Sequence, residues 1–376
     1  MSTLIWADDI TLGMTTALTG SSAALGNNMR AGVESYFNYI NQQGGVQGRQ
    51  LKLLVKDDGY EPVRAAFNMR EMIDQDNVLA IIGNVGTPTA IVTVPITNQK
   101  KTLLFGAFSG GDVLRADPPS RYVMNYRPSY ADETEKLIAG ILNSGIKAEE
   151  IAFFTQQDGF GNVGYLGVIN ALKRHGYHDT DKLWHVRYSR NSLNVEGAVA
   201  TLLNASIEPK AIIMAGSYAP SARFIELLQQ ELPEIWFFNL SFVGSYALKA
   251  SLPKDARHVV VTQVVPDMRS HYPIIDEYLA NLKRYSPALE PNDISLEGYI
   301  VAKIFHQGLI GIAGEITRES IIDGLEQLNK NDIGLGIPIS FSKQDHQAID
   351  KLWMITIDQG ELEPFSWSKL NILQNQ

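Results

Sequence analysis

Residues 79–89 read LAIIGNVGTPT, in which a short apolar run gives way to a glycine-rich loop. Leu79–Ile82 has the length of a buried strand, and the chain regains helical periodicity from about Thr89 to Asn98. A strand, a loop and a helix form half of a βαβ unit, whose strands lie parallel. We therefore expect an α/β protein with mostly parallel sheets.

The same alternation extends outward from this stretch and then repeats after Gly145. The first series predicts strands at Ile10–Met14, Leu51–Val55, Leu79–Ile82 and Thr102–Phe105 and helices at Asn27–Ile40, Pro62–Ile73 and Thr89–Asn98. The second predicts strands at Ile151–Phe154, Trp184–Tyr188, Ala211–Ala215, Ile235–Phe238 and Val259–Gln263 and helices at Gly164–His175, Val195–Leu203 and Ser221–Glu231. A chain of 376 residues with two such series is expected to form two domains.

The segments that join and follow the two series are less regular. Arg121–Arg127 is strand-like and ends at Pro128, and a helix is expected from about Asp132 to Leu142. A mainly helical stretch follows the second series, with helices at Pro273–Tyr285 and Leu296–Ala313. The last predicted strands, Ile339–Phe341 and Leu352–Ile357, are expected to be late additions to existing sheets.

Composition excludes several classes of function. The formal net charge is -9 and Lys and Arg form no basic block, so no nucleic-acid partner is expected. The chain has no cysteine, which excludes disulfides and thiolate catalysis and suits an oxidising compartment. No apolar run reaches the roughly 18 residues of a membrane helix. The first residues lack the basic and apolar regions of a signal peptide, which we expect to have been removed or never present.

Residues 159–164 match the GxGxxG pattern of dinucleotide-binding loops, between a predicted strand and a predicted helix. Four residues, 155–158, separate the strand from the first glycine and would hold a pyrophosphate away from the helix N-terminus. A tight loop with close helix packing is the favoured interpretation, and an NAD-dependent enzyme is the less favoured one.

Other catalytic patterns are incomplete. Ser109 stands one place late for the serine of a GxSxG elbow, so a hydrolase is not expected. His175 and His178 have a spacing that could ligate a metal, but Gly176 breaks the helix and no carboxylate pair joins them. We expect surface histidines, no metal, no cofactor and no catalysis.

Loops after the predicted strands are the candidate ligand site, because open α/β sheets bind ligands beyond the carboxyl ends of their strands. Residues 83–89 and 106–111 offer hydroxyls, backbone N–H groups and a helix N-terminus, which suit a carboxylate. Capping by Thr87 and turn formation by Ser109 are the structural alternatives. In the second series, polar and aromatic residues follow the strands, as in an enclosed small-molecule pocket: Asp158, Phe160, Ser217, Tyr218, Ser241 and Phe242.

Several motifs resemble the periplasmic binding proteins of branched-chain amino acid ABC transporters. Residues 41–49 read NQQGGVQGR, a pattern specific to that family, and Asp57-Asp58 follows the second strand. Leu18-Thr19-Gly20, residues 263–266 (QVVP) and residues 295–299 (SLEGY) add to the similarity, which covers nearly the whole chain.

The resemblance implies a type I Venus-flytrap fold with two Rossmann-like lobes joined by three hinge crossings. It implies an N-terminal lobe of residues 1–128 and 265–338 and a C-terminal lobe of 129–264 and 339–376, which close on a ligand. The matching positions assign ligand contacts to Gly86, Thr87, Ala107, Phe108, Ser109, Leu25, Phe160 and Tyr218. The hydroxyls of Thr87 and Ser109 would hold a carboxylate, the Ala107 carbonyl would face an amino group, and Phe160 would cover the ligand.

One position departs from the family pattern. Ser241 stands where amino-acid binders place a glutamate that pairs with the ligand's amino group, and serine cannot replace that ion pair. Either Asp158 supplies the missing charge or the ligand lacks an amino group. A third interpretation makes Asp158 a plain loop cap.

The resemblance implies a monomeric periplasmic protein that binds a small amino acid or related carboxylate and delivers it to the membrane permease of an ABC importer. The same fold also serves as the ligand-sensing ectodomain of membrane receptors. The chain itself does not separate these two functions.

Overall fold

The computed structural model describes residues 9–370, and in it the chain forms two compact units. Unit 1 contains the chain up to Ser109 together with residues 113–127 and 268–350. Unit 2 contains residues 110–112 and 128–267 and the chain from Lys351 onward. Residues 339–350, which the resemblance assigned to the second lobe, therefore belong to unit 1.

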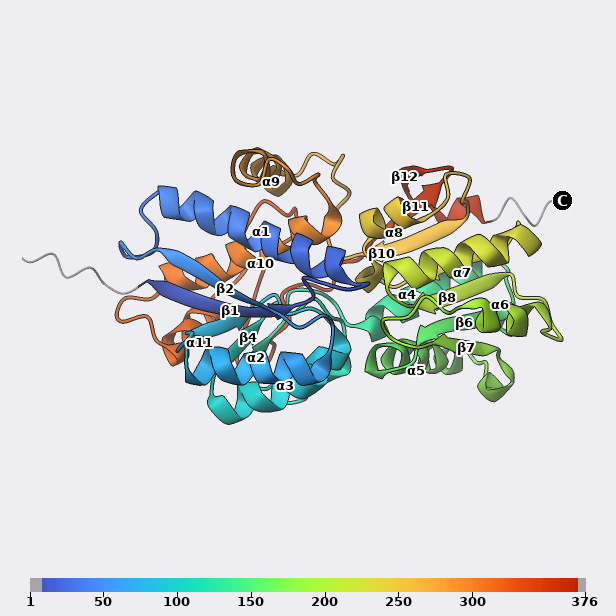
Figure 1. Ribbon diagram of the computed structural model, residues 1–376, viewed down its shortest axis with the longest axis horizontal. Helices are drawn as coiled ribbons and strands as arrows, with labels where there is room; N and C mark the ends of the chain where they lie inside the picture. The colour runs from blue at the N-terminus through green and yellow to red at the C-terminus, as the bar shows by residue number, and fades with distance from the viewer. Residues whose placement is uncertain (1–8, 371–376) are drawn as a thin grey trace, which may run out of the picture. The chain divides into compact units, whose positions relative to one another are not determined.

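Unit 1 is built on a parallel sheet with the strand order β2-β1-β3-β4-β5 (Figure 1). Its strands are β1 (Ile10–Thr16), β2 (Leu51–Asp57), β3 (Ala80–Ile82), β4 (Leu103–Phe105) and β5 (Val123–Met124). Its helices are α1 (Ala23–Gln42), α2 (Pro62–Asp74), α3 (Thr87–Lys100), α9 (Pro273–Tyr285), α10 (Asp293–Ile310) and α11 (Arg318–Glu326). Helices α1 and α10 pack together on one face of the sheet, and α2 and α3 cover the other.

Glycines allow α1 and α10 to approach closely. A methyl group at Gly32 of α1 would overlap the backbone carbonyl of Ser295, and one at Gly298 of α10 would overlap that of Met29. The helices can therefore meet backbone to backbone, with no side chain between them at these two points. This contact explains why the SLEGY segment carries a glycine inside a helix.

Unit 2 is built on a sheet with the order β12-β11-β10-β9-β8-β6-β7, parallel from β10 to β7 and antiparallel at β11 and β12. Its strands are β6 (Ile151–Gln156), β7 (His185–Tyr188), β8 (Ala211–Ala215), β9 (Trp236–Asn239), β10 (Val259–Gln263), β11 (Trp353–Asp358) and β12 (Glu361–Pro364). Its helices are α4 (Tyr130–Asn143), α5 (Gly159–Arg174), α6 (Glu196–Leu203), α7 (Tyr218–Glu231) and α8 (Ser245–Ser251). The predicted α/β class with two mostly parallel sheets is confirmed.

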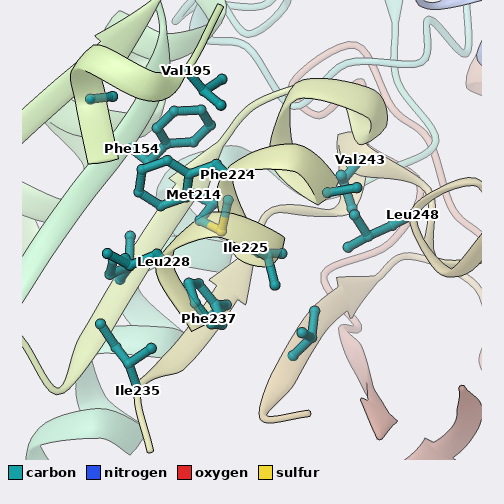
Figure 2. Packing of buried hydrophobic residues seen from close by; sticks show 14 of the residues in the cluster. Phe154, Val195, Met214, Phe224, Ile225, Leu228, Ile235, Phe237, Val243 and Leu248 are labelled. Atoms are coloured by element: carbon teal, nitrogen blue, oxygen red, sulfur yellow. The ribbon is translucent and has the colours of Figure 1, made fainter. Parts of the chain in front are cut away.

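The core of unit 2 shows why the strands read as apolar runs (Figure 2). Alternate residues of the strands point to one face, where α6, α7 and α8 cover them. Phe224 of α7 stacks on Phe154 of β6, with ring centroids 3.9 Å apart, and Leu228 lies one helical turn further on. Strands β6, β8, β9 and β10 are buried along their whole length, so these central strands are mostly apolar, as in other parallel sheets.

Two features differ from the sequence expectation. Ile339–Phe341 is not an added strand: Ile339 makes only an isolated bridge with Asn331 in unit 1. The apolar run is explained by side-chain burial instead, since the ring of Phe341 packs on Phe105 at 6.1 Å. The short elements α8, α11 and β12 are present although no sequence pattern indicated them.

Several helices begin earlier than their apolar periodicity suggested, and in α4 polar residues form the first turn. Helix α4 shows the cause: Ser129 accepts a hydrogen bond from the Asp132 N–H, and the Asp132 carboxylate accepts one from the Ser129 N–H. This capping box starts the helix at Tyr130. Within residues 9–370, no helix has the length and apolarity needed to cross a bilayer.

Candidate ligand-binding site

The strand orders locate a candidate site on each unit. In unit 1 the chain passes from β1 to β2 on one side and then to β3 on the other side of β1. In unit 2 it passes from β6 to β7 and then to β8 on the other side of β6. Open α/β sheets bind ligands at such switch points, beyond the carboxyl ends of the strands. The predicted ligand residues follow β3 and β4 in unit 1 and β6, β8 and β9 in unit 2, or begin α1.

The two loops of unit 1 are bonded to each other. The Gly86 N–H donates to the Phe108 carbonyl at 3.1 Å, and the Phe108 N–H donates to the Asn84 carbonyl at 2.8 Å. The Asn84 side chain in turn accepts the Thr15 N–H at 3.0 Å, at the end of β1. These bonds extend the sheet past its last regular pairs and fix the position of both loops.

Thr87 and Ser109 meet where the loops meet. Their hydroxyl oxygens lie 2.7 Å apart, and both residues are buried. Thr87 is the first residue of α3, so its N–H has no earlier carbonyl within the helix to accept it. Gly86 has φ 103°, and a side chain there would overlap the ring of Tyr60. The fold thus presents two hydroxyls at the positive end of a helix.

Ala107 and Phe108 precede Ser109 in the same loop, and Leu25 lies in α1 of the same unit. The Ala107 carbonyl accepts the Ser109 N–H at 2.8 Å, which makes a tight three-residue turn. The ring of Phe108 lies under the Arg127 guanidinium, whose central carbon is 4.0 Å from the ring centroid. Leu25 is fully buried in the first turn of α1. Structure thus brings the predicted loop residues of unit 1 together.

Arg127 is held by a buried ion pair that the sequence analysis did not predict. Its Nε and Nη2 atoms donate to the two oxygens of Glu297 on α10, at 2.9 and 2.6 Å. The side chains are 1% and 2% exposed. The pair joins α10 to the segment after β5 and supports Phe108 from behind. Both residues of the pair lie in unit 1. The SLEGY motif contains Glu297 but gives no indication of this partner.

Asp158 of unit 2 caps helix α5. Its Oδ1 atom accepts the Phe160 N–H at 3.0 Å, its Oδ2 atom accepts the Gln156 side-chain amide at 2.6 Å, and Arg190 lies 3.6 Å away. Burial raises the pKa of this carboxyl, opposed by the Gln156 hydrogen bond and by the Arg190 charge. The capping interpretation accounts for its position, and any contact with a ligand stays a prediction.

The aromatic and polar residues of unit 2 form a second group. The ring of Phe160 lies 5.1 Å from that of Tyr130 and 4.6 Å from that of Phe242. Tyr218 begins α7 and packs partly against the core of the unit. Ser241 donates from its hydroxyl to Glu133 at 2.7 Å. Phe160 and Ser241 are therefore joined through neighbouring residues, whereas Tyr218 follows a separate strand.

Residues 159–164 form the first turns of α5, not a loop that could surround a phosphate. A methyl group at Gly161 would overlap the Gln156 carbonyl, and one at Gly164 would lie 2.6 Å from the Cβ of Ala215. The glycines therefore allow helix α5 to pack on the sheet, which is the favoured interpretation of the motif. His175 bonds Glu135 at 2.9 Å, and within residues 9–370 no group of three His, Asp or Glu could hold a metal ion.

Sequence reasoning missed two buried carboxylates near these groups. Glu133 on α4 is fully buried and accepts bonds from Thr262 and from the Ser241 N–H and hydroxyl. Asp58 follows β2 and accepts the Thr15 hydroxyl at 2.9 Å and the Tyr60 N–H at 2.8 Å. Burial raises the pKa of Asp58 to about 6. The Asp57-Asp58 pair was visible as a motif, but Glu133 lies among charged residues of a helix and carries no local signal.

Comparisons with known proteins place these features in context. A family model described as periplasmic binding protein matches residues 9–361. Leu/Ile/Val-binding protein homolog 7 of Brucella melitensis is 22% identical over 361 residues, covering 90% of this chain and 87% of that protein.

Solved structures give the same picture. A crystal structure described as a possible leucine/isoleucine/valine-binding protein from Rhodopirellula baltica is 42% identical with a TM-score of 0.94, covering 98% of this chain and 100% of that one. The branched-chain amino acid transporter substrate-binding protein LivJ of Streptococcus pneumoniae, solved with isoleucine, is 15% identical with a TM-score of 0.78, covering 94% and 98%. At that identity the likeness is one of fold.

Proposed function

The chain belongs to the periplasmic binding protein family, and on that premise we propose that it binds a small molecule bearing a carboxylate, an amino acid or a related acid, and does no chemistry on it. The observation that carries the proposal is the Thr87–Ser109 hydroxyl pair, 2.7 Å apart at the N-terminus of α3. The names of the relatives, which refer to leucine, isoleucine and valine, favour the same class of ligand.

The chemistry of the pair suits an anion. A carboxylate has two oxygens that only accept hydrogen bonds, and hydroxyls and a free helix N–H can donate to both. The partial positive charge at a helix N-terminus favours the anion without a full counter-ion. Because the hydroxyls are already held by two bonded loops, little ordering is needed when the ligand binds.

We propose that the second set of residues, on unit 2, covers the same ligand. Phe160 would supply apolar area, and Tyr218 a ring with a polar end. The physiological role proposed is delivery, outside the cytoplasm, to the membrane permease of an ABC importer by a monomeric protein. The family membership supports this role.

Thermal unfolding of the purified protein against a panel of amino acids and carboxylates tests the binding. A ligand that binds only the native state raises the unfolding midpoint. Thr87→Val should lower the affinity for that ligand about 10- to 100-fold, because a hydrogen bond to a charged group contributes about 1.5 to 3 kcal/mol.

Thr97→Val is the matched control, since Thr97 is buried in the same helix and donates to the Thr93 carbonyl at 2.9 Å. It should leave the affinity unchanged. If no carboxylate raises the midpoint, or if both variants weaken binding equally, the proposed site is wrong.

A further inference from the structure

We propose that unit 2 has a second binding site, which takes a small organic cation with an apolar ring. The site is a cavity of about 450 Å³, a volume typical of small-molecule pockets. It is lined by residues 144–146, 208–210 and 231–236 and by Leu370, all of which belong to unit 2. The inference does not depend on the proposed function.

The cavity lies at the opposite edge of the sheet from the candidate ligand loops of unit 2. Its three longer segments precede strands: residues 144–146 come before β6, 208–210 before β8 and 231–235 before β9. These strands are neighbours and run parallel, so their amino ends share one edge of the sheet. Asp158 and Ser241, in contrast, follow the carboxyl ends of strands β6 and β9. The cavity is therefore a separate site.

Most of the buried residues that line the cavity are apolar. The apolar residues that are buried or half-buried there are Ile146, Pro209, Leu232, Ile235, Trp236 and Leu370. A ligand with an apolar ring would remove this surface and its own from water, which favours binding.

Trp236 adds one hydrogen-bond donor to this apolar lining. The residue is 4% exposed, and its indole Nε1–H has no hydrogen-bond acceptor within residues 9–370. Its ring is held in place by stacking on His258, with ring centroids 4.7 Å apart. A buried donor without an acceptor is costly, so a ligand that brings an oxygen to this group gains affinity. The ligand is therefore expected to carry an oxygen on its ring.

The charged residues around the cavity favour a cation. Glu208, Glu231 and Glu234 line it and are exposed, and their carboxylates have no salt-bridge partner in the described part of the chain. Lys210 also lines the cavity, but its Nζ atom is paired with Glu150 at 2.7 Å. The lining therefore has an excess of negative charge, with acceptors for the N–H groups of an ammonium.

Two helix C-termini act in the same direction. Helix α4 ends at Asn143 and helix α7 at Glu231, directly before or within the lining segments. The last carbonyls of a helix have no partner inside it and carry a partial negative charge, which favours cations. Neither helix has a basic residue in its last turn to compensate this charge. The ligand would supply the missing cation.

Tyramine has the three expected features, an aromatic ring, a ring oxygen and an ammonium group, and is the probe. Its matched control is 3-(4-hydroxyphenyl)propanoate, which has a carboxylate in place of the ammonium. Each is titrated into the full chain labelled with ¹⁵N in tryptophan, and the indole N–H signals are followed by NMR. The spectrum of Trp236→Phe identifies the Trp236 signal. Tyramine should shift this signal saturably, and the acid should do so at least about 10-fold more weakly, because like charges repel.

Glutamate variants test the cation preference. Glu231→Gln combined with Glu234→Gln should lower the affinity for tyramine about 5-fold, the size expected for exposed ion pairs. Glu361→Gln is the matched control, since Glu361 is exposed in β12 of the same unit and does not line the cavity. It should leave the affinity unchanged. Because these glutamates are exposed, the variants test the site even where Trp236→Phe does not fold.

Three results would overturn the inference. Tyramine could leave the Trp236 signal in place, which would mean that the cavity does not take this class of ligand. The acid could shift the signal at the same concentrations as tyramine, which would exclude a preference for cations. The paired glutamate variant could bind tyramine as tightly as the wild type, which would exclude these carboxylates as partners.

Discussion

Buried carboxylates at the strand ends accept hydrogen bonds from residues of their own unit, and their environments set their charge. Asp58 is the clearest case, because it is fully buried and its two bonded partners, Thr15 and Tyr60, are neutral. Burial raises its pKa to about 6 from the usual 3.8, and the nearby Asp57 charge acts in the same direction. Asp58 therefore makes part of the stability of unit 1 depend on pH.

The sign of this dependence follows from the raised pKa. Between about pH 4 and pH 6 the native chain keeps a proton that the unfolded chain has released, so the free energy of unfolding falls as the pH rises. The contribution is present in full below pH 4 and is lost by about pH 6, with a size of about 3 kcal/mol.

Asp58→Asn should remove this slope. Urea unfolding from pH 4 to pH 7 would measure it as the difference between the wild type and the variant. Asp181→Asn, on an exposed position, is the control and should leave the slope in place. A difference that stays constant over the whole range would contradict the assignment.

At the scale of elements, the α1–α10 contact determines how α10 sits on the sheet of unit 1. This matters for the site, because Glu297 of α10 holds Arg127, and Arg127 lies over Phe108. A shift of the helix pair would reach the Ala107–Ser109 loop through these contacts. Gly32 and Gly298, which allow this helix contact, therefore help to position the Ala107–Ser109 loop.

Gly32→Ala should destabilise the protein by about 1 to 3 kcal/mol, because the added methyl overlaps the Ser295 carbonyl and overpacked cores cost about this much. Gly197→Ala in α6 is the matched control: nothing lies within 4 Å of its added Cβ. Alanine there should be neutral or stabilising by up to about 1 kcal/mol. Denaturant unfolding would measure both, and equal effects would argue against close packing at Gly32.

For the whole molecule, the proposed function requires that each unit contribute to one ligand. Thr87→Val in unit 1 and Phe160→Leu in unit 2 should then each lower the affinity for the same ligand. Phe160→Leu should lower it by about 10-fold, because aromatic contact area is lost. Phe224→Leu is the control in unit 2, since Phe224 stacks on Phe154 in the core.

Titration of the best ligand of the panel into the three variants would measure these affinities. The control should lower stability and leave affinity unchanged. If Phe160→Leu binds the ligand as tightly as the wild type, the proposed contact of Phe160 with the ligand is wrong.

The sequence by itself determined the fold class, the order of most elements and the candidate loops. Strand and helix periods are local properties, and parallel sheets carry their ligand loops at one edge, so residues such as Thr87 and Ser109 could be selected before any coordinates. The family motifs added the remaining positions.

Only the tertiary structure decided what each polar group does. The SLEGY segment contains Glu297 but not its partner Arg127, 170 positions away in the chain. The sequence did not decide whether Asp158 caps a helix or pairs with an ammonium group. It also predicted, wrongly, that Ile339–Phe341 is a strand of a sheet. Hydrogen bonding and burial depend on residues distant in sequence. The bond from Ser241 to Glu133, 108 positions apart, therefore has no local signature in the sequence.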